Sequence, residues 1–127
     1  MKLQNLLLTF VLITACSSPQ NNSPLILQAT HEGSALSNSS FAFRKDNSFK
    51  WMNGLSNPVE GKYKIKDSFI TLDNLGFDKV VKSQYLKIIH QLPWSDFSAY
   101  FVVQIDDKGK IIDSHFVFRV VVDNRNK

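Results

Sequence analysis

The chain has 127 residues, of which 43% are hydrophobic and 12% aromatic, and its formal net charge is +4 at pH 7. The excess of 15 basic over 11 acidic residues is mild, and the basic residues do not cluster on one segment beside stacking aromatics, as nucleic-acid binding requires. The composition therefore argues against a nucleic-acid partner, and the single cysteine excludes an internal disulfide.

The beginning of the chain has the layout of an export signal. Lys2 places a positive charge near the start, residues 6–13 form an apolar stretch, and the small residues Thr14 and Ala15 precede Cys16. This order is typical of a secretory signal peptide. A membrane-spanning helix needs about 20 apolar residues, so the stretch is too short to be a stable transmembrane anchor.

The tetrapeptide Ile13–Cys16, Ile-Thr-Ala-Cys, resembles the lipobox of bacterial lipoproteins. The resemblance implies that residues 1–15 are a signal peptide that is removed, and that Cys16 carries diacylglycerol and further acyl chains such as palmitate. Two or more chains give stable membrane attachment. Ser17, in place of an acidic residue, implies the outer membrane of the cell envelope. The alternative is an ordinary signal peptide with a chance cysteine at the cleavage site.

Residues 16–24 follow as the lipidated cysteine and a polar segment rich in Ser, Asn and Pro, which predicts a flexible tether. Residues 25–127 are long enough to bury a sizeable core and contain no repeat, so we expect one domain there.

Alternation of apolar and polar residues recurs along residues 25–127 and predicts strands joined by tight turns. The first hairpin pairs residues 41–44 with 49–52, and the second pairs 63–65 with 70–72. In the second hairpin, Lys62, Lys64 and Lys66 form the solvated side of a strand.

Two further strands are expected at residues 80–81 and 85–92, although Leu86, Ile89 and Leu92 would also share one side of a short helix. Residues 101–105 and a long return strand, 111–122, form the last hairpin around a glycine-containing loop. The fold class is therefore all-β, a small antiparallel meander barrel or sandwich of about 7–9 strands.

A second resemblance covers residues 40–73. The motif Gly61-x-Tyr63-x-Ile65 followed by Ile70-x-Leu72, after an F-x-F hairpin that ends at Phe49, is similar to lipocalin-like lipoproteins of bacteria. It implies a lipocalin-like β domain, and with it an apolar ligand. The chain lacks the G-x-W signature near the start that marks true lipocalins.

No catalytic constellation is recognisable in the sequence, and we expect no enzyme activity. Glu32 and Glu60 are the only glutamates, and most aspartates fall in predicted turns, where their side chains bind local backbone. There is no G-x-S-x-G elbow, glycine-rich phosphate loop or H-E-x-x-H motif. We expect no cofactor besides the covalent lipid.

The three histidines, His31, His90 and His115, are the only candidates for a metal site, which Glu32 or Asp113 could complete for zinc or copper. Their spacing does not indicate convergence, so three unrelated imidazoles are the preferred interpretation.

The aromatic residues provide the remaining site candidates. Trp94 lies in the irregular segment QLPWSDF with Phe97 nearby, and could anchor a partner, cover an apolar cavity or plug the barrel. A cavity would be lined by Tyr63, Phe101 and Phe116. The expected function is a membrane-anchored envelope lipoprotein with a non-catalytic β domain that binds a small apolar ligand or another envelope protein. The alternative is a metal-binding or metal-stress role for the histidines.

Overall fold

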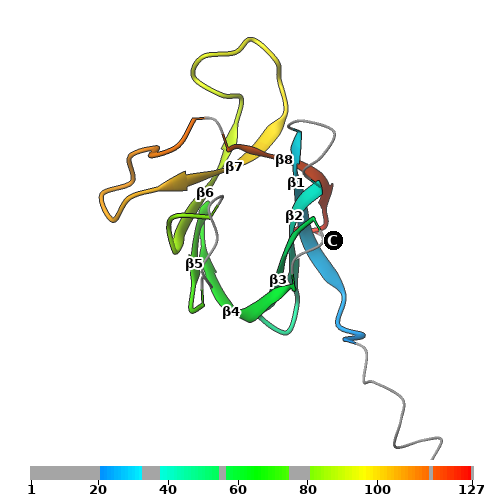
Figure 1. Cartoon of the computed structure of the whole chain (residues 1–127). Coiled ribbons are helices and arrows are strands. Elements are labelled where there is room, and N and C mark those ends of the chain that lie inside the picture. The colour runs from blue at the N-terminus through cyan, green and yellow to red at the C-terminus, as the bar shows by residue number, and fades with distance from the viewer. Residues whose placement is uncertain (1–20, 33–37, 55–56, 75–80, 115, 127) are drawn as a thin grey trace, which may run out of the picture.

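The computed structural model describes residues 21–32, 38–54, 57–74, 81–114 and 116–126. These residues form eight antiparallel strands that close into a barrel, in which each strand pairs with the next and the last pairs with the first (Figure 1). The strands are β1 Leu25–Glu32, β2 Asn38–Arg44, β3 Ser48–Asn53, β4 Val59–Lys66, β5 Phe69–Leu72, β6 Tyr85–His90, β7 Tyr100–Ile105 and β8 Phe118–Asp123. The prediction of an all-β meander barrel is confirmed.

Three of the predicted strands differ from the structure or had an alternative interpretation. Of the two interpretations for residues 85–92, the strand is correct, because β6 pairs along its whole length with β7. The predicted strand over residues 111–122 is wrong in its first half, because β8 begins only at Phe118 and Ile111 forms an isolated bridge with Ile105. Of the predicted strand at 80–81, Val81 is buried and lies outside any strand, whereas Val80 lies outside the described residues.

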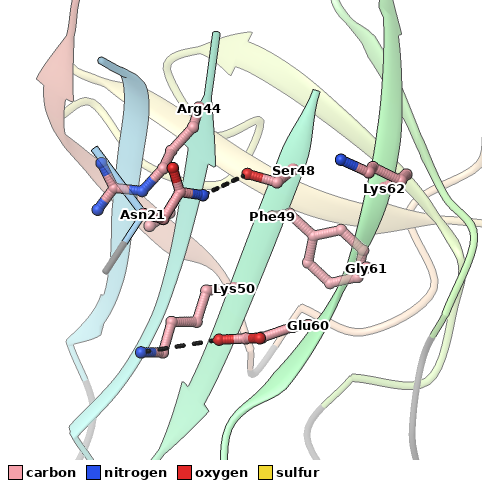
Figure 2. A pocket seen from close by; sticks show the side chains of 9 residues that line it. Asn21, Arg44, Ser48, Phe49, Lys50, Glu60, Gly61 and Lys62 are labelled. Atoms are coloured by element: carbon pink, nitrogen blue, oxygen red, sulfur yellow. Dashed lines mark hydrogen bonds and ion pairs between the residues drawn. The ribbon is translucent and has the colours of Figure 1, made fainter. Parts of the chain in front are cut away.

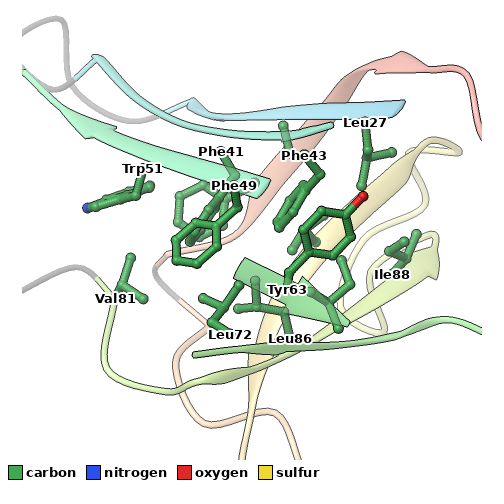
Figure 3. Packing of buried hydrophobic residues seen from close by; sticks show 14 residues of the cluster. Leu27, Phe41, Phe43, Phe49, Trp51, Tyr63, Leu72, Val81, Leu86 and Ile88 are labelled. Atoms are coloured by element: carbon green, nitrogen blue, oxygen red, sulfur yellow. The ribbon is translucent and has the colours of Figure 1, made fainter. Parts of the chain in front are cut away.

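Aromatic rings fill the interior of the barrel. The ring centres of Phe41 and Trp51 lie 4.6 Å apart, and those of Phe43 and Tyr63 lie 5.0 Å apart. Figure 3 shows the rings of Phe41, Phe43 and Trp51 facing Tyr63, Leu72 and Leu86, which come from the other wall of the barrel. An eight-stranded barrel can be filled by its own side chains or hold one small ligand. Here the contacts between the rings take up the space that a ligand would need.

A second apolar cluster covers the outer face of β6 and β7. Its buried members are Leu92, Phe101, Val103 and Ile105. Ile111 and Val117 pack against them because the segment between β7 and β8 folds back over this face. Residues 101–105 are consequently buried on both sides of the sheet. This packing is the physical reason why residues 112–114 and 116–117 leave the predicted strand.

The antiparallel order places the connections at two ends of the barrel. We call proximal the end that carries the start of β1, the turns 45–47 and 67–68, the loop 91–99 and the end of β8. We call distal the opposite end, which carries the 106–117 connection.

Residues 21–24, the last part of the expected tether, are bound to the β2–β3 turn at the proximal end. Four hydrogen bonds hold them there, of which Figure 2 draws the first: Asn21 Nδ2 to Ser48 Oγ (3.0 Å), Arg44 Nη1 to the Ser23 carbonyl (2.8 Å), the Asp46 amide to Ser23 Oγ (3.0 Å) and the Lys45 amide to the Pro24 carbonyl (2.9 Å). The chain is therefore fixed to the barrel from residue 21 onward.

Gly61 is a position where the packing requires glycine. A Cβ atom at this position would lie 2.8 Å from Cε1 of the buried Phe49, and would also overlap the Asp73 carboxylate that accepts a hydrogen bond from the Lys62 amide. We expect Gly61→Ala to lower the free energy of unfolding by about 1–3 kcal/mol through overpacking. Chemical denaturation tests this, with the exposed neighbour Lys62→Ala as control; an unchanged midpoint for Gly61→Ala would contradict it.

Candidate functional site

The candidate site is the β6–β7 loop, residues 91–99, which extends beyond the ring of strands in Figure 1. Its two large aromatic side chains, Trp94 and Phe97, are 51% and 52% exposed. The guanidinium carbon of Arg119 lies 5.0 Å from the centre of the Phe97 ring, a cation–π contact. These are the only two of the five aromatic candidates that the structure leaves largely open to solvent.

Local hydrogen bonds give the loop a defined backbone. Gln91 has a positive φ of 75°, and its amide donates to the Ala99 carbonyl at 2.8 Å, which closes the base of the loop. The Ser95 amide donates to the Leu92 carbonyl at 3.1 Å, and Gln91 Nε2 donates to the Ser95 carbonyl at 3.0 Å. Because Leu92 is buried in the second cluster, the loop is attached to the barrel by apolar packing as well.

The other three aromatic candidates do not meet. Tyr63 lies inside the barrel, where its hydroxyl donates to the Arg44 carbonyl at 2.7 Å and burial raises its pKa above the ordinary value. Phe101 belongs to the second cluster on the opposite side of the sheet. Phe116 is half-buried near His31, with ring centres 5.2 Å apart. The structure therefore does not form a cavity lined by Tyr63, Phe101 and Phe116.

We expect Trp94→Ala to change the free energy of unfolding by less than about 0.5 kcal/mol, because an exposed side chain loses little burial on truncation. The loop hydrogen bonds run through backbone atoms and through Gln91, so they survive the substitution. Chemical denaturation of the variant measures this change. Trp51→Ala, which removes a ring that is 2% exposed, is the matched control and should cost about 3–5 kcal/mol. A comparable loss for Trp94→Ala would identify Trp94 as a structural plug.

The histidines lie in different surroundings. His31 Nδ1 is 3.2 Å from the Val117 carbonyl, and His90 Nε2 is 3.1 Å from Ser98 Oγ. His115 lies outside the described residues. Asp113, which was a candidate to complete a metal site, is buried, and its Oδ2 forms an ion pair with Lys82 Nζ at 2.9 Å. Within the described residues, no three His, Cys, Asp or Glu side chains are grouped so that they could hold a metal ion.

Two aspartates with shifted pKa values have structural roles in turns. A hydrogen bond from the Ser48 side chain lowers the pKa of Asp46, and one from the Lys110 backbone amide lowers that of Asp106. Both carboxylates close the hairpin turns in which they lie, as expected for turn aspartates.

The surface of the described residues has hollows that the sequence does not predict. A groove of about 750 Å³ lies on the outer face of β2–β4, but charged side chains line much of it, including the 4.0 Å Lys50–Glu60 pair in Figure 2. A second hollow, of about 500 Å³, lies at the proximal end. Ile26, Ile65 and Tyr100 line it together with Arg125, from four different strands or their ends, so no local pattern could have predicted it.

Comparison with family models, with curated proteins and with solved structures gives no match for this chain. Within the described residues, no helix is both long and apolar enough to cross a membrane.

Proposed function

We propose that the protein is a membrane-anchored envelope lipoprotein, held at the outer membrane by acyl chains on Cys16, whose non-catalytic β domain acts by surface contact. The contact element is the 91–99 loop with Trp94 and Phe97. The domain does not enclose a small apolar ligand in its barrel.

The filled barrel interior carries this proposal. The rings of Phe41, Phe43, Trp51 and Phe118 pack against one another at centre distances of 4.6–5.5 Å. A carrier of an apolar ligand would need that space to be empty. Exposed aromatic residues on an ordered loop, by contrast, are the side chains that most often contribute strongly to binding at surfaces. Such a loop could bind another envelope protein or insert into the apolar part of the membrane.

Native mass spectrometry tests the proposal on the full chain purified from its own host's envelope. We expect the covalent mass of acyl chains on Cys16 and no further bound mass. A lipid-sized mass that denaturation releases would show a hollow barrel and contradict surface contact. A retained metal ion would instead support a role for the histidines.

A further inference from the structure

The exposed aromatic loop and the segment that leads to Cys16 lie at the same end of the barrel. Ile26, at the start of β1, and Tyr100, directly after the loop at the start of β7, line the same proximal hollow. The Arg125 guanidinium, just beyond β8, lies 5.4 Å from the Tyr100 ring centre. The start of β1, the start of β7 and the residues after β8 therefore lie close together at the proximal end.

The free chain between Cys16 and the barrel is short. Because residues 21–24 are hydrogen-bonded to the β2–β3 turn, only residues 16–20 can act as a spacer. Five residues span at most about 18 Å when fully extended. A lipid on Cys16 would thus keep the β2–β3 turn, to which residue 21 is bound, within about 18 Å of the membrane surface, whatever conformation the spacer adopts.

We propose that the proximal end of the barrel lies against the membrane, and that Trp94 and Phe97 enter the interfacial region of the bilayer at the end of the barrel that carries the lipid anchor. This inference rests on the proposed acylation of Cys16 and identifies the occupant of the 91–99 loop as a lipid surface. Tryptophan suits this region because its ring is apolar while its N–H remains able to hydrogen-bond.

The charged side chains at the proximal end are of both signs, which is compatible with contact between this end and neutral lipid. Exposed side chains of both signs lie at this end: Lys45 and Asp46 on one turn, Lys66 and Asp67 at the next, and Asp96 in the loop itself. Their opposite signs leave no strong basic patch, so the contact does not require anionic headgroups. Apolar insertion next to an anchored chain is therefore expected to be insensitive to salt.

The test uses the full, lipidated chain reconstituted into phosphatidylcholine vesicles, with or without bromine on the acyl chains, since bromine quenches nearby tryptophan emission. Mass spectrometry first verifies the acyl mass on Cys16. The fluorescence emission of Trp94 is obtained by subtracting the emission of Trp94→Phe from that of the wild type. We expect most of this emission to be lost in brominated vesicles. Trp94→Phe alone, which retains the buried Trp51, should be unaffected by bromine.

A tryptophan placed at the distal end provides the matched control. Ile112 is 44% exposed in the 106–117 connection, so Ile112→Trp in the Trp94→Phe background should not be quenched. Equal Trp94 emission in both kinds of vesicle, on an acylated chain, overturns the inference but leaves the anchor intact. Protection of Trp94 from acrylamide in native envelope membranes, but not in pure lipid vesicles, would identify a protein partner and also overturn it. Absence of the acyl mass overturns the anchor and this inference together.

Discussion

Phe118→Ala should lower the free energy of unfolding by about 3–5 kcal/mol, because it leaves a cavity where a fully buried ring was. Phe118 is 0% exposed, and its ring packs edge-on against Phe41 at 5.2 Å and Trp51 at 5.5 Å. It also lies at the seam where the barrel closes, since β8 pairs with β7 only through Phe101↔Arg119 and Val102↔Phe118. Chemical denaturation of the purified variant measures the loss.

Val121→Ala is the control on the same strand. Its side chain is 52% exposed, so truncation should change stability by less than about 0.5 kcal/mol. If Phe118→Ala left the denaturation midpoint where the wild type has it, the burial of Phe118 in the closed barrel would be refuted.

Cys16→Ser should abolish membrane attachment. A serine hydroxyl cannot form the thioether that the lipobox resemblance implies, so the variant lacks the acyl chains that supply the proposed attachment. We expect the variant to move from the detergent phase to the aqueous phase on detergent phase separation, and its mass to lack diacylglycerol.

Ser17→Ala is the control, because it leaves Ile13–Cys16 intact and should remain in the detergent phase. A variant that still carries its signal peptide could also partition into detergent, so the mass of each product is measured alongside. Acylation of the Cys16→Ser chain, or detergent partition of a cleaved and unacylated chain, would contradict the anchor.

Local alternation was sufficient to predict most strands. Phe41 and Phe43, Phe49 and Trp51, and Ile70 and Leu72 alternate with polar neighbours, and each pair lies in the barrel interior as the period of two requires. The same rule placed Lys62, Lys64 and Lys66 on the solvent side, where the structure has them.

Alternation failed where a strand is buried on both faces. The run Phe101-Val102-Val103 has no polar residue to mark an outer side, and Phe101 in fact faces the second cluster while Val102 faces the barrel interior. Three consecutive apolar residues are themselves a signal of two-sided burial, but they do not say which face is the interior. Alternation therefore predicts a common cavity for Tyr63 and Phe101, whereas the structure places the two residues in different clusters.

The all-β class, most strand positions and the candidate loop with Trp94 and Phe97 can be predicted from the amino-acid sequence, because turn chemistry and period-two alternation are local properties. Three features emerge only from the folded chain: β8 closes on β1, side chains fill the interior, and the segment before Leu25 and the aromatic loop share one end. Those features depend on contacts between residues far apart in the chain, such as His31 with Phe118, and no local pattern encodes them.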